Sequence, residues 1–115
     1  MRLFESGITG TMVTRNRIAL APMGPLGLLD LDLGVSQRLI DFYVARAKGG
    51  AGMIMTGATL VNRTLEAGFV SYMLRFDGPE YISRLSELCE AVQHYGAKLV
   101  IQLSAGFGRR TRFPE

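Results

Sequence analysis

The chain has 115 residues, of which 48% are hydrophobic, 20% charged and 9% aromatic. This composition is typical of one folded domain, and it excludes an intrinsically disordered chain, a collagen-like repeat and a disulfide scaffold. The formal net charge is +3, and the last seven residues, with three Arg and one Glu, supply +2 of it. Because a nucleic-acid-binding protein needs a sustained basic face, we expect no nucleic-acid partner.

Cys89 is the only cysteine, which excludes an internal disulfide and a metal site built from thiolates. It falls on the apolar side of a helical pattern, so we interpret it as a small buried hydrophobe. The N-terminus lacks an apolar segment of signal-peptide length, and prolines and glycines interrupt the apolar stretch at 18–29. We therefore expect no membrane partner, no metal and a cytoplasmic location.

Short apolar segments mark the expected strands. Residues 3–16 alternate such segments with Gly, Thr and Asn turn formers, which predicts a small lead-in hairpin. Residues 18–21, 52–58 and 98–103 are apolar almost throughout, as is typical of strands buried on both faces. A parallel sheet covered by helices is the arrangement that buries strands in this way.

Two helical patterns separate these strands. The first begins after Ser36, a preferred N-cap residue, and ends at 49–50, where two glycines follow each other. The second opens at Asp77, which we expect to cap the helix while Glu80 reaches back, and it ends at Gly96. The inward stripe expected for this second helix is Tyr81 or Ile82, Leu85, Leu88, Cys89 and Val92.

The order of elements is therefore β-α-β-α-β, which is shared by the open doubly wound sheet and the closed eight-fold barrel. A barrel needs about 250 residues, so three strands cannot close one. A complete small nucleotide-binding domain of the doubly wound kind is the alternative. It is disfavoured because the glycines of 106–108 have Thr111 where a third glycine is needed, and no acidic residue ends the second strand.

In parallel α/β folds, ligands bind outside the carboxyl ends of the strands. Those ends are 22–24, 57–59 and 102–104, and none of them contains a carboxylate pair or a histidine. Small residues there let a flat ring approach the backbone. Gln102 offers a donor and an acceptor together, which matches an adjacent C=O and N–H, such as those at the pyrimidine edge of a flavin. Ordinary packing is the alternative explanation for the small residues.

Four segments carry a family resemblance. They read NRIALAPMG at 16–24, RLIDFYVARAKGG at 38–50, GMIMTGA at 52–58 and HYGAKLVIQL at 94–103. In this order and spacing they resemble the old yellow enzyme family of FMN-dependent oxidoreductases, whose fold is an eight-stranded α/β barrel preceded by a hairpin. Residues 1–115 therefore resemble the N-terminal part of an FMN-binding TIM-barrel domain, incomplete as it stands.

The resemblance implies where FMN would lie. It places backbone groups of Pro22, Met23 and Gly24 against the flavin ring, Ala58 beside the carbonyl edge of the ring and Gln102 on its pyrimidine edge. It implies NAD(P)H as reductant, with hydride passing through FMN to an activated alkene, namely an enoate, enoyl-CoA or enone. In the family the catalytic acid and the carbonyl-binding groups lie on later strands, so none is assigned here. We expect the chain alone to have no catalytic activity, and to need the remainder of the barrel or an oligomeric partner.

The residues after the third strand resemble one branch of this family. Many members have His-x-Gly-Arg there, whereas 104–109 read SAGFGR. That form resembles the branch with 2-enoate reductases, 2,4-dienoyl-CoA reductase-like enzymes and bile-acid oxidoreductases, in which an iron–sulfur cluster and an FAD/NAD(P)H domain follow the barrel. The resemblance implies FAD and the cluster only for a longer parent protein. Arg109 is a candidate for binding a carboxylate, CoA or phosphate of the substrate, with a solvated charge as the alternative.

Overall fold

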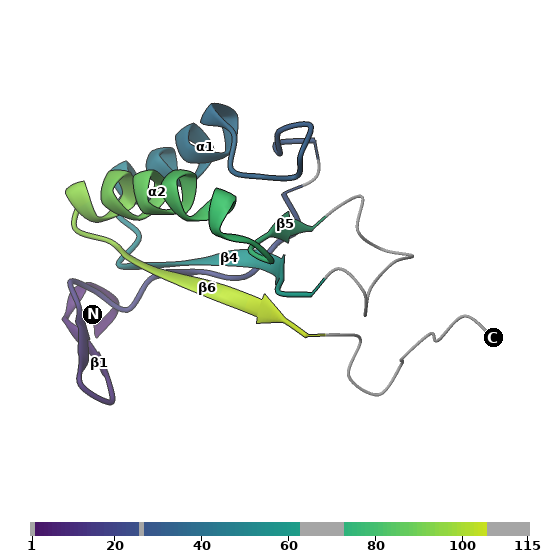
Figure 1. The fold of residues 1–115 in the computed structure, drawn as a ribbon. Coiled ribbons are helices and arrows are strands. Elements are labelled where there is room, and N and C mark those ends of the chain that lie inside the picture. Colours follow the sequence, from purple (N-terminus) through teal and green to yellow (C-terminus); the bar gives the residue numbers. More distant parts are fainter. Residues whose placement is uncertain (1, 26, 63–72, 106–115) are drawn as a thin grey trace.

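A parallel β-sheet with two α-helices on one face forms the body of the protein (Figure 1). The computed structural model describes residues 2–25, 27–62 and 73–105. The strands of this sheet are β3 (Ala19–Leu20), β4 (Met53–Leu60), β5 (Leu74–Arg75) and β6 (Lys98–Ser104), and the helices are α1 (Gln37–Lys48) and α2 (Ile82–His94). Strand β4 pairs in parallel with β3 at its start, with β5 at its end and with β6 along its length.

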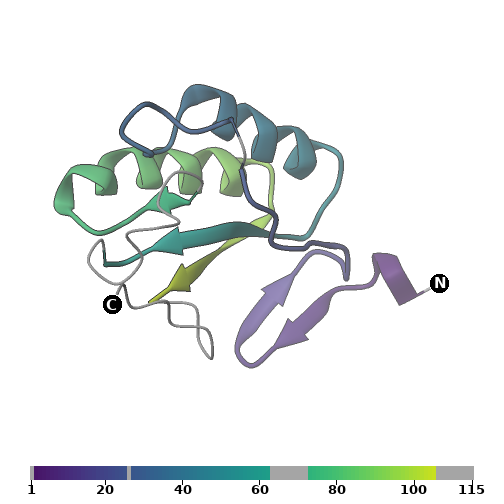
Figure 2. The ribbon, with the colours of Figure 1, turned by 90° about the vertical axis from the view of Figure 1, so that its right-hand side faces the viewer.

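An antiparallel hairpin precedes the sheet and confirms the predicted lead-in. It consists of β1 (Gly7–Thr9) and β2 (Met12–Thr14) and follows a short 3-10 turn, η1 (Arg2–Phe4). Gly10 has a φ of +59° in the connecting turn, a backbone conformation that glycine adopts without steric cost. The hairpin lies at the amino ends of β4 and β6 (Figures 1 and 2).

Helix α1 has the boundaries that the sequence predicts. The Ser36 hydroxyl accepts a hydrogen bond from the backbone N–H of Leu39 at 3.1 Å, which satisfies one free donor of the first turn. Gly49 caps the other end, and Gly50 turns the chain toward the sheet with a φ of +107°. The buried face consists of Leu39, Ile40, Tyr43 and Ala47.

The start of α2 differs from the prediction. A 3-10 turn, η3 (Pro79–Tyr81), precedes the helix, so the cap positions are Gly78 and Tyr81, and the expected Asp77 cap is wrong. The Asp77 carboxylate instead accepts two hydrogen bonds from the Arg75 guanidinium, both at 2.8 Å. Both side chains are at most 10% exposed, and a buried guanidinium requires such a partner because an unpaired buried charge is strongly destabilising.

The inward stripe of α2 is confirmed for Tyr81, Leu85, Leu88 and Val92, all of which are buried. Ile82, the alternative to Tyr81, is 51% exposed, because the 3-10 turn changes the rotation at which the helix begins. Cys89, expected to be a small buried hydrophobe, is only half-buried. Partial burial, and secondly the Glu90 carboxylate, raise the pKa of its thiol, which keeps the thiol protonated.

The strands agree with the prediction in position and differ in length. The segment 18–21 contributes a two-residue strand, and the segment 52–58 continues to Leu60. Strand β5 lies where a loop was expected, because two residues are too few to leave a hydrophobic pattern. It is recognised by its backbone bonds, among them that from Phe76 N–H to the Leu60 carbonyl at 2.8 Å.

The core lies between the helices and one face of the sheet. Both helices pack side by side on this face (Figures 1 and 2). Leu99 and Ile101 of β6 pack against the core, so by strand alternation Val100 and Gln102 lie on the opposite face. Within the described ranges no helix covers that opposite face, which is the arrangement of an incomplete barrel.

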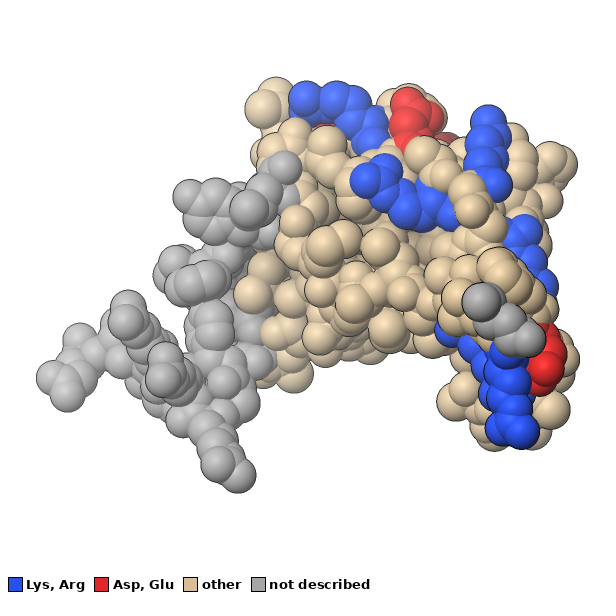
Figure 3. Space-filling view, turned by 180° about the vertical axis from the view of Figure 1, so that it is seen from behind, with Lys and Arg blue, Asp and Glu red and all other residues tan. Residues whose placement is uncertain are grey.

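The surface is unevenly charged. Seen from behind, Lys and Arg side chains lie over the helices and at the hairpin end, while a broad part of the visible surface carries no charge (Figure 3). Neither helix in the described part of the chain has the length and apolar character that crossing a membrane requires.

Candidate functional site

The carboxyl ends of β4 and β6 and the segment that follows β3 lie together at one edge of the sheet and bring the predicted site residues together. Pro22, Met23 and Gly24 follow β3, and Ala58 and Gln102 are directly paired across β4 and β6. We call these five residues, together with Gly57, the strand-end band. Figure 1 shows this edge on the right, where the strand arrows point.

Gly57 joins the first strand end to the second. A Cβ atom at Gly57 would overlap the carbonyl oxygen of Met23, and it would lie 2.9 Å from the Met23 carbonyl carbon and 3.1 Å from the Gly24 Cα. The backbone of residues 23–24 therefore packs directly on β4, and only glycine leaves room for it. The three strand ends form one continuous surface as a result.

A β-bulge in β4 sets the register between the second and third strand ends. Met55 is paired with Val100 and Ala58 with Gln102, so β4 has one residue more than β6 over this interval. Without the extra residue, Ala58 would not lie opposite Gln102. The bulge therefore creates the pairing that the predicted site requires.

The strand-end band is open to a flat ligand. Gln102 is exposed, Met23 is 51% exposed and Ala58 is half-buried. At Gly24 no heavy atom lies within 4 Å of the position that a Cβ would take. None of the six residues is titratable, so the band offers ring contact, backbone groups and one amide rather than acid–base chemistry. These properties fit a flavin ring, whose contact with the five residues stays a prediction.

Three buried hydroxyl groups lie behind the band, and the sequence analysis did not identify them. The Tyr43 hydroxyl accepts a hydrogen bond from the Gly57 N–H at 3.3 Å, and the Thr59 hydroxyl donates to the Gly57 carbonyl at 3.2 Å. The Thr56 hydroxyl accepts from the Gln102 N–H at 3.1 Å and lies 3.4 Å from the Thr59 hydroxyl. Burial raises the pKa of Tyr43 although the Gly57 bond lowers it, so the phenol stays neutral.

The sequence does carry a signal for these hydroxyls. Tyr43 belongs to the apolar stripe of α1, and Thr56 and Thr59 lie within an otherwise apolar strand. A hydroxyl in such a position must find a partner, because a buried polar group without a hydrogen bond costs about 1–3 kcal/mol. What the sequence does not show is that all three find their partners at the same bulge.

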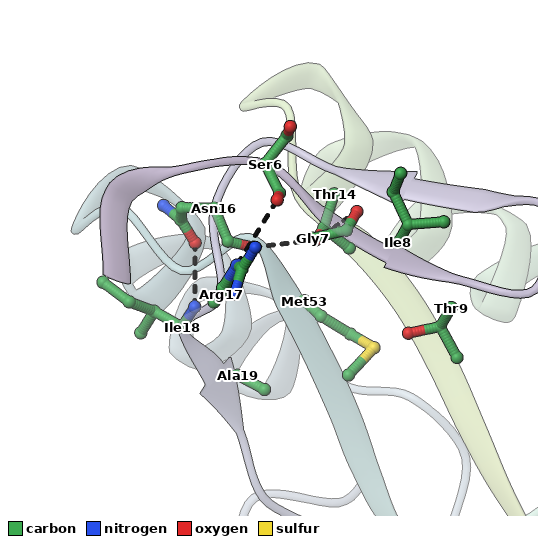
Figure 4. A pocket seen from close by; sticks show the side chains of 10 residues that line it. All are labelled: Ser6, Gly7, Ile8, Thr9, Thr14, Asn16, Arg17, Ile18, Ala19 and Met53. Carbon is green, nitrogen blue, oxygen red and sulfur yellow. Dashed lines mark hydrogen bonds between the residues drawn. The ribbon is translucent and has the colours of Figure 1, made fainter. Parts of the chain in front are cut away.

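A cavity of about 440 Å³ lies at the opposite, amino end of the sheet, between the hairpin and β3 (Figure 4). It is lined by Ser6, Gly7, Ile8, Thr9, Thr14, Asn16, Arg17, Ile18, Ala19 and Met53. The Thr14 hydroxyl donates to the Asn16 carbonyl at 2.7 Å, and the Asn16 side-chain oxygen accepts from the Ile18 N–H at 3.1 Å. These side chains fix the hairpin to the sheet, so we assign no ligand to this cavity.

Arg15 links the hairpin to the ends of both helices. One terminal nitrogen of its guanidinium donates to the Tyr95 carbonyl at 2.6 Å, and the other donates to the carbonyls of Ala47 and Ala51 at 2.6 and 2.9 Å. The last carbonyls of a helix carry partial negative charge. One arginine thus binds carbonyls at two helix ends, those of Ala47 and Tyr95, and the Ala51 carbonyl in the loop after α1, and we call this group the Arg15 clamp.

One predicted residue of the site has no structural test. Arg109, the candidate for binding an acidic group of the substrate, lies outside the described residues, as do Gly106 to Gly108 and Thr111.

Comparison with known proteins identifies close sequence relatives. Residues 2–112 match the NADH:flavin oxidoreductase / NADH oxidase family. The chain is 45% identical over 109 residues to the cinnamate reductase of Clostridium sporogenes, covering 93% of this chain and 16% of that protein. It is 44% identical over 109 residues to the NADH oxidase of Thermoanaerobacter brockii, covering 95% of this chain and 16% of that protein.

A solved structure shows the same fold. The chain superposes on the Old Yellow Enzyme from Pichia sp. with a TM-score of 0.78 at 20% sequence identity, over 89% of this chain and 26% of that chain. The described strands and helices are therefore the N-terminal part of an α/β barrel, as the sequence predicts. The chain spans only about a sixth of the length of the two sequence relatives.

Proposed function

The chain belongs to the NADH:flavin oxidoreductase / NADH oxidase family, and we propose that its strand-end band holds the flavin ring of FMN. The observation that carries this proposal is the convergence of three strand ends on one uncharged, open surface. The bulge of β4 brings Ala58 and Gln102 into direct register, and Gly57 admits the backbone of Met23 beside them. Residues 1–115 are then the N-terminal part of an FMN-binding barrel domain.

Different residues of the strand-end band would make different contacts with the ring. The open space at Gly24 admits the ring to the backbone, and the half-exposed Met23 side chain supplies a polarizable apolar contact. The Gln102 amide supplies one donor and one acceptor to the polar edge of the ring. When bound, FMN supplies hydride transfer from NAD(P)H to the β-carbon of an activated alkene. The chain's own residues bind and orient the ring.

The proposed substrate is an alkene conjugated to a carbonyl group, as an enoate, enoyl-CoA or enone. Support comes from the 45% identity to a protein named for the reduction of cinnamate, an aromatic enoate. Arg109 is proposed to bind an acidic group of this substrate. An iron–sulfur cluster and FAD are proposed only for a longer parent protein, as the branch resemblance implies.

The test is a titration of the protein, expressed at the full length that its gene encodes, with FMN and then with NADH or NADPH and cinnamate. We expect a flavin absorption spectrum in the purified protein and consumption of the reduced nicotinamide that depends on the alkene. A protein that takes up no FMN contradicts the proposed function. FMN uptake without alkene-dependent turnover contradicts the substrate class alone.

A second proposal concerns the 115-residue chain by itself, which we propose is catalytically silent and requires the remainder of the barrel. The observation that favours it is a groove of about 310 Å³ between α2 and β6, whose lining includes Ile82, Cys89 and Ile101. Ile82 is 51% exposed and the neighbouring Leu103 is 59% exposed. Because α1 and α2 lie side by side and successive crossovers of a barrel keep the same hand, we propose that a helix following β6 in a longer parent protein fills this groove.

Sedimentation of the 115-residue chain tests this second proposal. We expect association that increases with concentration, because apolar surface and strand edges are open. Adding the rest of the barrel in the same chain is expected to abolish the association and to protect Cys89 from alkylation. A 115-residue monomer that reduces enones with bound FMN would contradict the proposal.

A further inference from the structure

The buried hydroxyls of Tyr43, Thr56 and Thr59 lie behind the proposed flavin surface. Resting on the proposed function, we propose that Tyr43, Thr56 and Thr59 are positioning residues for the flavin. They hold the bulge of β4, and the bulge presents the strand-end band to the ring. Each of the three acts through backbone groups of β4 or β6 and not by contact with the ring.

The hydrogen bonds of these hydroxyls form one ordered chain. Each threonine hydroxyl has a single proton, and that of Thr59 is donated to the Gly57 carbonyl. The contact between the two hydroxyls at 3.4 Å is then a bond from Thr56 to Thr59. This leaves the oxygen of Thr56 free to accept from the Gln102 N–H. This row of hydrogen bonds therefore runs from the backbone N–H of Gln102 through Thr56 and Thr59 to the carbonyl of Gly57.

Tyr43 completes the arrangement from the other side. Its hydroxyl accepts from the Gly57 N–H, so both backbone groups of Gly57, which has no register partner in β6, are bonded to side chains. A bulge interrupts the ladder of the sheet and leaves such groups without strand partners. Buried without partners, they would favour a regular strand, in which Ala58 no longer lies opposite Gln102.

The position of this row of hydrogen bonds explains how it can affect the binding of the flavin. It begins at the backbone of Gln102, which carries the one amide of the strand-end band, and ends at Gly57, on which the backbone of Met23 packs. A shift of the bulge would move all three strand ends relative to one another. Thr56 and Thr59 are at most 1% exposed and Tyr43 is 2% exposed, so water cannot replace a lost hydroxyl there without local opening.

The first test compares two buried threonines in the full-length protein with bound FMN. Thr56→Val removes the hydroxyl that accepts from Gln102, and Thr14→Val removes a buried hydroxyl bond at the hairpin end. We expect Thr56→Val to weaken FMN binding about 10-fold, equivalent to about 1.4 kcal/mol. It should also shift the visible absorption and circular dichroism of the flavin. Thr56→Ser, which keeps the hydroxyl, is expected to restore both.

The second test compares two buried tyrosines. Tyr43→Phe removes the hydroxyl bonded to Gly57, whereas Tyr81→Phe removes one that donates to the Asp32 carbonyl at 3.3 Å, outside the strand-end band. Both variants, and Thr14→Val, are expected to lower the melting temperature by a few degrees. Only Tyr43→Phe is expected to change the flavin spectrum and to shift the reduction potential of the bound flavin.

The outcomes separate this inference from the function on which it rests. Wild-type protein that takes up no FMN contradicts the proposed function and the inference with it. Wild-type protein with FMN, in which Thr56→Val and Tyr43→Phe leave affinity, spectrum and potential unchanged, contradicts the inference alone. The same result follows if Thr14→Val or Tyr81→Phe changes the spectrum and potential equally. The inference is supported when the changes follow the three hydroxyls and not the melting temperature.

Discussion

A glycine lies against another backbone segment at each end of β4, but the surroundings of the two glycines differ. At the amino end, a Cβ on Gly52 would lie 2.8 Å from the Asn16 carbonyl oxygen, and at the carboxyl end one on Gly57 would overlap the Met23 carbonyl. Both glycines thus admit another backbone segment against the strand. At the amino end, side chains of the hairpin and the Arg15 clamp bond the nearby carbonyls. At the carboxyl end, Met23 and Gln102 remain exposed.

The two ends of β4 therefore contribute differently, the amino end to stability and the carboxyl end to the proposed binding of a ligand. Polar groups that satisfy one another within the protein, as at the hairpin end, stabilise the folded state and leave little for a ligand. In the strand-end band, buried hydroxyls fix the backbone from the core side, and the exposed side chains remain available to bind a ligand. This division agrees with the general rule that barrel chemistry lies at the carboxyl ends of the strands.

The largest effect is expected from Gly57→Ala, which breaks the carboxyl end. The added methyl group overlaps the Met23 carbonyl, so the backbone must shift, at a cost of about 3 kcal/mol in the free energy of unfolding. FMN binding is expected to be lost as well. Chemical denaturation and FMN titration measure the two effects. Gly24→Ala is the matched control for the free energy of unfolding alone, since its methyl group meets open space. It is no control for FMN binding, because that space is proposed to admit the ring.

The next effect is expected from Arg15→Ala, which breaks the amino end. Loss of three charge-assisted bonds, two to helix-end carbonyls and one to the Ala51 carbonyl in the loop after α1, lowers the free energy of unfolding by about 2 kcal/mol. Denaturation is expected to show this loss while the affinity for FMN stays unchanged. Arg17→Ala is the control: Arg17 and Glu5 are exposed and 3.7 Å apart, and such a pair contributes about 0–1 kcal/mol. Weaker FMN binding by Arg15→Ala would remove the distinction between the two ends.

A smaller effect, confined to binding, is expected from Gln102→Leu. The exposed amide makes its proposed contacts only with the ligand, so its loss weakens FMN binding about 10-fold, or about 1.4 kcal/mol. The melting temperature is expected to stay the same, because the backbone bond to Thr56 remains. A large loss of stability with unchanged FMN affinity would mean that Gln102 belongs to the fold rather than to the site.

The smallest effect is a dependence on alkaline pH. Burial raises the pKa of Tyr43 and of Tyr81 above the ordinary value of 10.0. The stabilisation that comes from keeping these phenols neutral is complete below about pH 10 and is lost as pH rises through the folded-state pKa. Thermal unfolding between pH 9 and 11 measures it. Tyr43→Phe is expected to flatten this dependence in part, and an unchanged profile would contradict burial of an ionisable phenol there.

Much of the fold follows from the sequence because its main signals are local. The hairpin, the Ser36 cap of α1 and the buried strand β4 each depend on neighbouring residues, and all three are where the sequence predicts them. The convergence of the predicted site residues also follows, since parallel strands bring their carboxyl ends to one edge.

The remaining features depend on contacts between distant residues. Strand β5 exists because its backbone pairs with β4, and two residues carry no periodicity that would reveal it. From the sequence, Asp77 is predicted to cap the helix. In the structure its carboxylate pairs with the buried guanidinium of Arg75 instead. The bulge, too, is stabilised by Tyr43 from another element, 14 residues away in the chain.

Amide hydrogen exchange of the full-length protein, with and without FMN, shows directly whether the strand-end band holds the ring. If the strand-end band holds the ring, FMN is expected to slow exchange at Met23, Gly24, Ala58 and Gln102, and to leave the amides of the hairpin at 7–14 unchanged. Slower exchange at the hairpin end with none at the strand-end band would contradict the assignment of the site.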